Sequence, residues 1–166
     1  MKLYNEHNKR FLKVSGFRLS FVLSILLCGL VNLSFGQTNT SNNELQVKES
    51  ILDYVEGVYE ADTTRIYRSV HPTLVKRGTW YDNQIGDYVP LDEMNFQQLV
   101  QLTKTWNSDG QNADSSSSRE ISIYDLQDKT ATAKLTAVWG TDYMHLAKIE
   151  GKWYIMNVLW QTHERK

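Results

Sequence analysis

The sequence predicts an α+β fold, in which helices pack on one face of an antiparallel sheet. In three segments between residues 43 and 103, apolar side chains recur at helical spacing, as in Val47, Ile51 and Val55. From residue 119 onward, short segments alternate between apolar and polar residues, as expected for strands with one buried face. The predicted order is helix, helix, hairpin, helix and then a run of strands, rather than a regular alternation of strand and helix. We therefore expect the helices to be segregated on one face of the sheet.

The first predicted helix spans residues 43–60. Ser41 and Glu44 have the spacing of a capping box, in which Ser41 accepts from the first-turn amides and Glu44 reaches back. Gly57 lies inside this helix at a cost of about 1 kcal/mol relative to alanine. We therefore expect another element to pack closely against Gly57.

A short second helix is predicted over residues 63–71, capped by Asp62 and ended by Pro72. Residues 73–80 are rich in β-branched side chains and predict a strand. The turn-rich segment 81–87 follows and leads into another extended run. This pattern predicts a hairpin.

A third helix is predicted after Asp92, which we expect to be its N-cap. Four of its residues share one face: Phe96, Leu99, Val100 and Thr103. Residues 107–118 contain four consecutive serines and a single apolar residue, Ala113. We expect a mobile loop here within one domain, because neither half of the chain could bury a core alone.

Four strands complete the domain, over residues 119–126, 129–139, 143–149 and 152–161. The second alternates most regularly, and its apolar set is Ala131, Ala133, Leu135, Ala137 and Trp139. Glu150-Gly151 predicts a tight turn between the last two strands. These segments predict a long antiparallel meander.

Residues 1–36 have the three-part layout of a secretory signal peptide. Basic side chains come first, an uncharged apolar stretch follows, and the small residues Ser34 and Gly36 precede Gln37. A membrane anchor is the first alternative, but the uncharged stretch is short for a stable span. A lipoprotein modified at Cys28 is the second, although large leucines precede this cysteine.

We therefore expect cleavage after Gly36, a disordered lead-in over residues 37–43, and a domain over residues 44–162 in the periplasm or outside the cell. Cleavage would leave 13 basic against 18 acidic side chains, a net charge of about −5, and would remove the only cysteine. No basic patch remains to indicate nucleic acid binding. Disulfides and thiolate chemistry are excluded from such a domain.

Several short motifs occur in a characteristic order. Tyr54-x-x-Gly57 and Asp62 lie on the predicted helix pair, and His71-Pro72 follows. The C-terminal hairpin reads Leu146-x-Lys148-Ile149-x-Gly151-x-Trp153-x-Ile155-x-Asn157-x-Leu159-Trp160. From about Leu45 to Trp160, the chain resembles the nuclear transport factor 2-like superfamily, and within it the bacterial branch named "putative lumazine-binding".

The resemblance implies a cone-shaped, cystatin-like fold, with three N-terminal helices packed on a strongly bent antiparallel sheet and a pocket at the open end. It also implies that dimers are common and that the host is a Gram-negative bacterium. It leaves function open, because the superfamily includes isomerases, dehydratases, cyclases, transport factors and binding modules.

Five residues are candidates for the ligand-binding pocket: Tyr54, His71, Trp139, His145 and Asn157. If Trp153 points inward, as the resemblance implies, Asn157 lies on the inner face, with His145 as its neighbour. The alternatives are that both only satisfy local hydrogen bonds or that His145 faces solvent. His71 could act as an acid or base, or could cap the second helix. The aromatic side chains could stack on a flat ligand or fill the core.

Acidic residues fall at predicted caps and turns, Asp142 among the turns, so we expect no buried carboxylate. A mechanism like that of ketosteroid isomerase is therefore not favoured, and no cofactor or metal site is predicted. The last strand is apolar on both faces, since Tyr154, Met156, Val158 and Trp160 oppose the inner set. This pattern predicts a homodimer through the outer face of the sheet.

Three interpretations remain open. The first, which we favour, is a binding domain that holds a small, flat, apolar ligand in the cone without catalysis. The second is an isomerase, dehydratase or cyclase that uses a histidine or Asn157 in the pocket. The third is a structural or dimerisation module whose cone is filled by its own side chains, such as Trp139 and Trp153.

Overall fold

The computed structural model describes residues 40–165. The predicted signal peptide and residues 37–39 of the lead-in lie outside the described residues. Residues 40–59 form a helix, which already includes residues 40–43, so Ser41 lies within it rather than at its N-cap. Glu44 does not reach back to cap the helix but pairs with Lys48 one turn later, with 2.7 Å between Oε1 and Nζ. The predicted capping box is therefore wrong.

The second helix, α2, covers Thr63–Ser69. Asp62 caps it as predicted, because its side chain accepts from the Thr64 amide at 2.8 Å. A Cβ at Gly57 would lie 3.1 Å from Ile66, which confirms the expected close packing by another element. Arg65 joins α2 to the helix of residues 40–59 by an ion pair with Glu56, 2.6 Å between Nη1 and Oε2.

The predicted hairpin is present but longer than expected, because β1 covers Val70–Asp82 and β2 covers Asp87–Asn95. Asp92 therefore lies in β2, and its predicted role as a helix cap is wrong. Asn95 still pairs with Val75 of β1, so β2 continues three residues beyond Asp92.

The third helix, α3, covers Phe96–Trp106 and is capped by Asn95. Asn95 and Gln98 form a capping box, in which each side chain accepts from the other's backbone amide. The predicted apolar face is confirmed, because its four residues are buried: Phe96, Leu99, Val100 and Thr103.

A loop follows α3, as predicted, and the Asn107 side chain organises it. Its amide nitrogen donates to the carbonyls of Tyr59 and Ala113, at 2.6 and 2.9 Å. Its oxygen accepts from the backbone amides of Asn112 and Ala113. The loop is thereby fastened to the C-terminal end of the helix of residues 40–59.

The last four strands are β3 (Arg119–Leu126), β4 (Thr130–Ala137), β5 (Gly140–Ile149) and β6 (Lys152–Gln161). The sheet order is β2-β1-β6-β5-β4-β3. Neighbouring strands are antiparallel except β1 and β6, which are parallel. The sheet is thus mixed, because the connection from β1 to β6 runs through the whole meander. The α+β fold class is confirmed.

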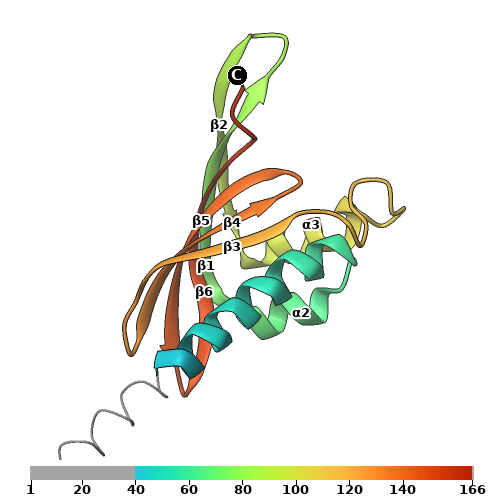
Figure 1. Ribbon diagram of the computed structural model, residues 1–166. Coiled ribbons are helices and arrows are strands. Elements are labelled where there is room, and N and C mark those ends of the chain that lie inside the picture. The colour runs from blue at the N-terminus through green and yellow to red at the C-terminus, as the bar shows by residue number, and fades with distance from the viewer. Residues whose placement is uncertain (1–39, 166) are drawn as a thin grey trace, which may run out of the picture. The chain divides into compact units, whose positions relative to one another are not determined.

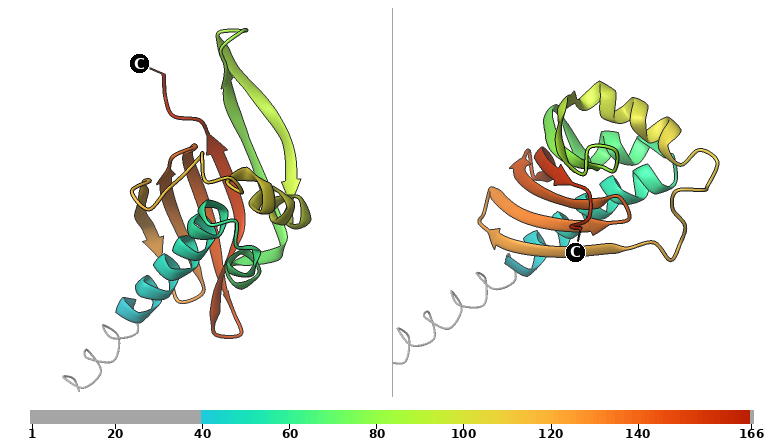
Figure 2. Two further views of the ribbon diagram at one scale, coloured as in Figure 1. Left: turned by 90° about the vertical axis from the view of Figure 1, so that its right-hand side faces the viewer. Right: turned by 90° about the horizontal axis from the view of Figure 1, so that it is seen from above.

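The three helices lie on one face of the sheet, and the strands curve around the helix of residues 40–59 (Figures 1 and 2). The core fills this concave side, with Val47, Ile51 and Val55 from the helix against Leu135 and Met144 from the sheet. In β4 the predicted inner set is buried, from Ala131 to Ala137 at every second position. Within residues 40–165, each helix is too short or too polar to cross a membrane.

A β-bulge interrupts the pairing of β5 with β6. His145 pairs with Asn157, whereas the next residue, Leu146, pairs with Ile155, so Met156 has no partner. An extra residue on one strand reverses which side chains face the core beyond it. In β6, Ile155 points inward before the bulge, and Val158 points inward after it.

Candidate functional site

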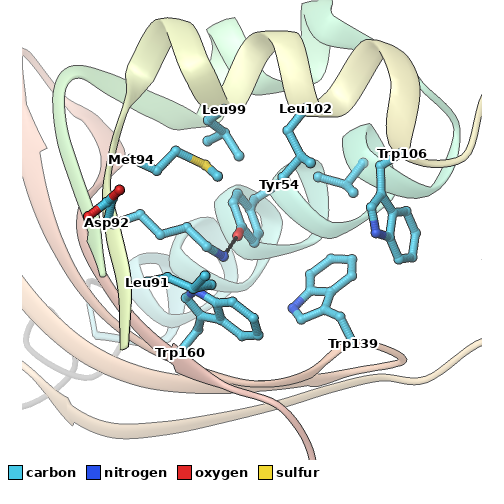
Figure 3. A pocket seen from close by; sticks show the side chains of 11 residues that line it. Tyr54, Leu91, Asp92, Met94, Leu99, Leu102, Trp106, Trp139 and Trp160 are labelled. Carbon is cyan, nitrogen blue, oxygen red and sulfur yellow. Dashed lines mark hydrogen bonds between the residues drawn. The ribbon is translucent and has the colours of Figure 1, made fainter. Parts of the chain in front are cut away.

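A cavity of about 240 Å³ opens on the concave side of the sheet. The helix of residues 40–59, α3, β2 and the inner face of the sheet all contribute to its wall (Figure 3). Its lining is mostly apolar and aromatic: Tyr54, Val58, Lys76, Leu91, Asp92, Met94, Leu99, Leu102, Trp106, Trp139 and Trp160. A concave, largely apolar site with few polar groups is typical of small-molecule binding.

The main polar feature of the cavity is a buried ion pair behind its wall. Lys76 of β1 is 6% exposed, and Asp142 of β5 is fully buried. Lys76 Nζ lies 3.0 Å from Asp142 Oδ1 and 2.7 Å from Tyr54 Oη. Lys76 lines the cavity but Asp142 does not, so the carboxylate supports the amine from behind.

Asp142 is fully engaged by its neighbours. Its Oδ2 accepts from the indole Nε1 of Trp139 at 2.9 Å and from the Tyr54 hydroxyl at 3.4 Å. Burial, followed by the negative charge of Asp142, raises the pKa of Tyr54 well above its usual 10.0. Tyr54 therefore remains a neutral phenol across the physiological pH range.

Strand register brings these groups together. On the inner face, Gly78, Trp160 and Asp142 are direct neighbours across β1, β6 and β5. A Cβ at Gly78 would lie 2.4 Å from the Trp160 ring, so only glycine lets the indole lie this close to β1. Lys76 is one inward position along β1, and its Nζ lies 5.5 Å from the centre of the Trp160 ring.

The aromatic wall opposite Lys76 is fixed by ring contacts. Trp139 packs edge-on against Trp106 at 5.3 Å and against Tyr59 at 5.3 Å between centroids. The Tyr59 hydroxyl donates to the Ser118 carbonyl and accepts from the Val138 amide, which holds the turn carrying Trp139. The wall is therefore formed before any ligand enters.

Residues 42–161 match the protein family described as "Putative lumazine-binding". This segment makes up well over half of the sequence. The chain belongs to this family. No curated protein is similar enough to match.

Solved structures show the same fold for this domain. One is a nuclear transport factor 2-like protein of unknown function from Silicibacter pomeroyi, 15% identical, TM-score 0.56, covering 75% of this chain and 98% of its own. Another, of the same description, comes from Shewanella baltica, 18% identical, TM-score 0.53, covering 75% and 97%. A third, with a cystatin-like fold and unknown function, comes from Nostoc punctiforme, 14% identical, TM-score 0.50, covering 74% and 92%. These likenesses establish the nuclear transport factor 2-like fold.

Two of the five predicted pocket residues line the cavity. Tyr54 comes from the helix of residues 40–59, and Trp139 comes from the turn between β4 and β5. Their rings are in edge contact, with centroids 6.2 Å apart. They also share Asp142 Oδ2 as a hydrogen-bond acceptor.

The other three predicted residues lie elsewhere. His145 is exposed on the outer face of β5, and Asn157 lies beside it because the bulge at Met156 turns it outward. Asn157 Nδ2 donates to the Val75 carbonyl of β1 at 3.0 Å. His71 is in β1 rather than at the end of α2, and its Nδ1 lies 2.7 Å from Thr73 Oγ1.

The sequence reasoning missed Lys76 and Asp142, and the expectation of no buried carboxylate was wrong. Asp142 shares strand parity with Met144 and Leu146, which are apolar, but its neighbours Gly140 and Thr141 suggested a turn. Lys76 likewise shares strand parity with Leu74 and Gly78. A lysine and an aspartate that each interrupt an apolar inner face would have predicted a buried pair.

The described residues contain no group of three or more histidine, cysteine, aspartate or glutamate side chains that could hold a metal ion. Asp92 lines the cavity but is exposed on β2. The polar side chains of the lining are those of Lys76, Tyr54 and Asp92, and the tryptophan rings surround them.

Proposed function

We propose that this domain, exported by the signal in residues 1–36, binds a small, flat, largely apolar molecule in the cavity. The main observation in support of the proposal is the aromatic wall of the cavity. Trp106, Trp139 and Trp160 surround the space shown in Figure 3, and Lys76 supplies its main hydrogen-bond donor. Flat aromatic surfaces favour ligands with rings, because stacking and edge contacts add to the burial of apolar area.

The cavity volume supports a ligand of one or two rings. A dry apolar cavity of about 150 Å³ accommodates benzene, and the cavity here measures about 240 Å³. This is below the roughly 300–1,000 Å³ of pockets that hold drug-sized molecules. The volume also argues against the interpretation of a filled cone, because Trp139 forms a wall and Trp153 does not line the cavity.

The polar anchor supports a ligand with a hydrogen-bond acceptor. An ammonium group has three N–H donors, and Lys76 uses two of them on Tyr54 and Asp142. The third is available for a carbonyl oxygen or ring nitrogen at the cavity wall. Because Asp142 already balances the charge of Lys76, an uncharged acceptor enters without leaving an unpaired charge behind.

The geometry favours binding over proton abstraction by the buried carboxylate of Asp142. Asp142 accepts three hydrogen bonds and does not line the cavity, so it has no direct access to a ligand. The histidines and Asn157 considered for an isomerase, dehydratase or cyclase lie away from the cavity. A general base must reach the proton that it removes.

Lumazine is a suitable test ligand, because it has two fused rings with carbonyl acceptors and gives the family its description. We expect saturable quenching of tryptophan fluorescence on titration with lumazine. Trp160→Ala should weaken binding about 10-fold, since one aromatic contact contributes about 1–1.5 kcal/mol. Trp80→Ala is the matched control, because Trp80 is 38% exposed on β1 and does not line the cavity.

Equal affinity in the wild type and in Trp160→Ala would contradict the proposed location. Native mass spectrometry of protein purified from its own host would identify a retained ligand. A ligand without rings or without an acceptor would contradict the proposed ligand class.

We also propose a homodimer through the outer face of the sheet. Tyr143 of β5 and Leu159 of β6 are direct cross-strand partners on this face and are 46% and 56% exposed. Pairing two such faces would bury both side chains. Sedimentation velocity should show a dimer at micromolar concentration that Leu159→Glu dissociates, and a monomeric wild type would contradict the proposal.

A further inference from the structure

We propose that Lys76 forms a reversible imine with a small aromatic aldehyde or ketone held in the cavity. The inference rests on the proposed function, because the carbonyl compound must first occupy the cavity. It adds a covalent step to the binding site and narrows the ligand class to reactive carbonyl compounds. The juxtaposition that carries it is an amine on an apolar wall, with a carboxylate and a neutral phenol in direct contact.

Lys76 differs from the other lysines whose contacts the structure describes. Lys48 is a solvated partner of Glu44 on the helix surface. Lys148 donates to Asn43 Oδ1 at 2.7 Å and lies 6.0 Å from the Trp153 ring, but it does not line the cavity. Lys76 is 6% exposed and reaches the cavity between the rings of Tyr54 and Trp160. Lysines in such apolar pockets are those that form Schiff bases with carbonyl substrates.

The neighbours of Lys76 provide the proton transfers that imine formation needs. Asp142 Oδ1 lies 3.0 Å from Nζ and can take one ammonium proton, which removes two buried charges at once. Tyr54 Oη lies 2.7 Å from Nζ and is a neutral phenol, because burial and Asp142 raise its pKa. A phenol at this position can pass a proton from the nitrogen to the carbonyl oxygen.

The step balances with no outside reagent. The ammonium of Lys76 gives a proton to Asp142, and the free amine attacks the carbonyl carbon, forming the C–N bond. One proton moves from nitrogen to oxygen through Tyr54, which gives a carbinolamine. Asp142 then gives up its proton, which reaches the hydroxyl group through the Tyr54 phenol. The C–O bond breaks, water leaves, and the nitrogen lone pair forms a protonated imine. The new positive charge lies where the ammonium charge was, beside the regenerated Asp142 carboxylate.

The shape of the cavity selects the carbonyl compound. The body of the ligand must be flat and apolar to lie against Trp139 and Trp160. Its carbonyl group must point toward Nζ of Lys76, on the β1 side of the cavity. A cavity of about 240 Å³ holds one or two rings. A sugar is not apolar and a long aliphatic aldehyde is not flat, so neither has the body that the cavity requires.

The test uses benzaldehyde with sodium cyanoborohydride, which converts an imine into a stable secondary amine. The purified protein is incubated with both, and the modified residues are mapped by mass spectrometry of peptides. We expect Lys76 to carry most of the adduct in the wild type and the adduct to disappear from the cavity in Lys76→Arg, which keeps the positive charge. Lys148→Arg is the matched control and should leave the labelling of Lys76 unchanged.

A second arm separates the imine from the binding function. Benzyl alcohol has the same ring without a carbonyl, and its binding is measured by calorimetry. Benzyl alcohol binding without a Lys76 adduct would overturn the imine and leave the binding proposal standing. If neither benzyl alcohol nor lumazine binds and no adduct forms, both proposals fall. Should Lys76→Arg not fold, protection of wild-type Lys76 from labelling by benzyl alcohol supports the imine site, and labelling of surface lysines alone overturns it.

Discussion

The two ends of the inner face of the sheet use the same type of residue differently. At the end near the β5–β6 turn, Trp153 is 1% exposed and fills the core, and its carbonyl accepts from Ser50 of the covering helix. At the other end, Trp139 and Trp160 remain partly exposed and surround a cavity. The difference depends on what covers each end. The helix of residues 40–59 packs directly on Trp153. The cavity instead separates Trp160 from α3 (Figure 3).

The polar groups follow the same division. The buried ion pair of Lys76 with Asp142 lies at the hollow end, where it borders the cavity. Buried ion pairs are weak sources of stability, because the loss of hydration offsets most of the attraction. Its position beside the cavity therefore agrees better with the proposed binding role than with a role in stability. Substitutions at the packed end, around Trp153, should therefore mainly affect stability. Substitutions at the hollow end, around Trp139 and Trp160, should mainly affect binding.

The largest expected effect is at the packed end. Trp153→Ala should lower the free energy of unfolding by about 4–5 kcal/mol, because it removes a fully buried indole and leaves a cavity in the core. Trp160→Ala, at the hollow end, should cost about 1 kcal/mol, since one side of its ring already faces open space. Urea unfolding of both variants measures this difference. Equal losses would contradict the division into a packed and a hollow end.

The next effect concerns the buried pair. Asp142→Ala should destabilise by about 3–4 kcal/mol, because it leaves the Lys76 ammonium and the Trp139 indole N–H without their buried acceptor. Glu44→Ala removes one partner of an exposed pair with Lys48 and should cost less than about 0.5 kcal/mol. A loss below about 1 kcal/mol for Asp142→Ala would show that the pair is solvated rather than buried.

The pH dependence sharpens the comparison further. The pKa of Tyr54 is raised in the folded state, chiefly by burial, so its contribution to stability is complete below pH 10.0 and is lost as the pH rises above that value. Above about pH 10, this residue should lower the free energy of unfolding by up to about 1.4 kcal/mol per pH unit. Tyr54→Phe should show a flatter profile than the wild type in urea unfolding between about pH 9 and pH 11. Identical slopes would contradict the burial of the phenol.

Much of the fold could be predicted because it depends on local patterns. The strands β3 and β6 begin and end at the predicted residues, since alternation and turn residues define both ends. The sequence also predicted the Asp62 cap of α2 correctly. It did not predict the cap of α3, because an aspartate such as Asp92 before an apolar run is equally compatible with a strand that continues to Asn95.

The candidate site was harder to predict, because it depends on register. Strict alternation from Trp153 places Asn157 inside, but one unpaired residue, Met156, reverses the faces and brings Trp160 inward instead. No local pattern marks that bulge, because both faces of β6 carry mostly apolar side chains. The ion pair of Lys76 with Asp142 depends in turn on placing β6 between β1 and β5, which is a long-range feature.

The smallest expected effect is at Asn157, on the outer face. Asn157→Leu removes one hydrogen bond, from Nδ2 to the Val75 carbonyl, and should cost about 0.5–1.5 kcal/mol of stability. It should leave the affinity for lumazine unchanged, because the side chain points away from the cavity. Fluorescence titration beside that of Trp160→Ala measures the contrast. A loss of affinity in Asn157→Leu as large as that in Trp160→Ala would place Asn157 on the inner face and would mean that β6 has no bulge.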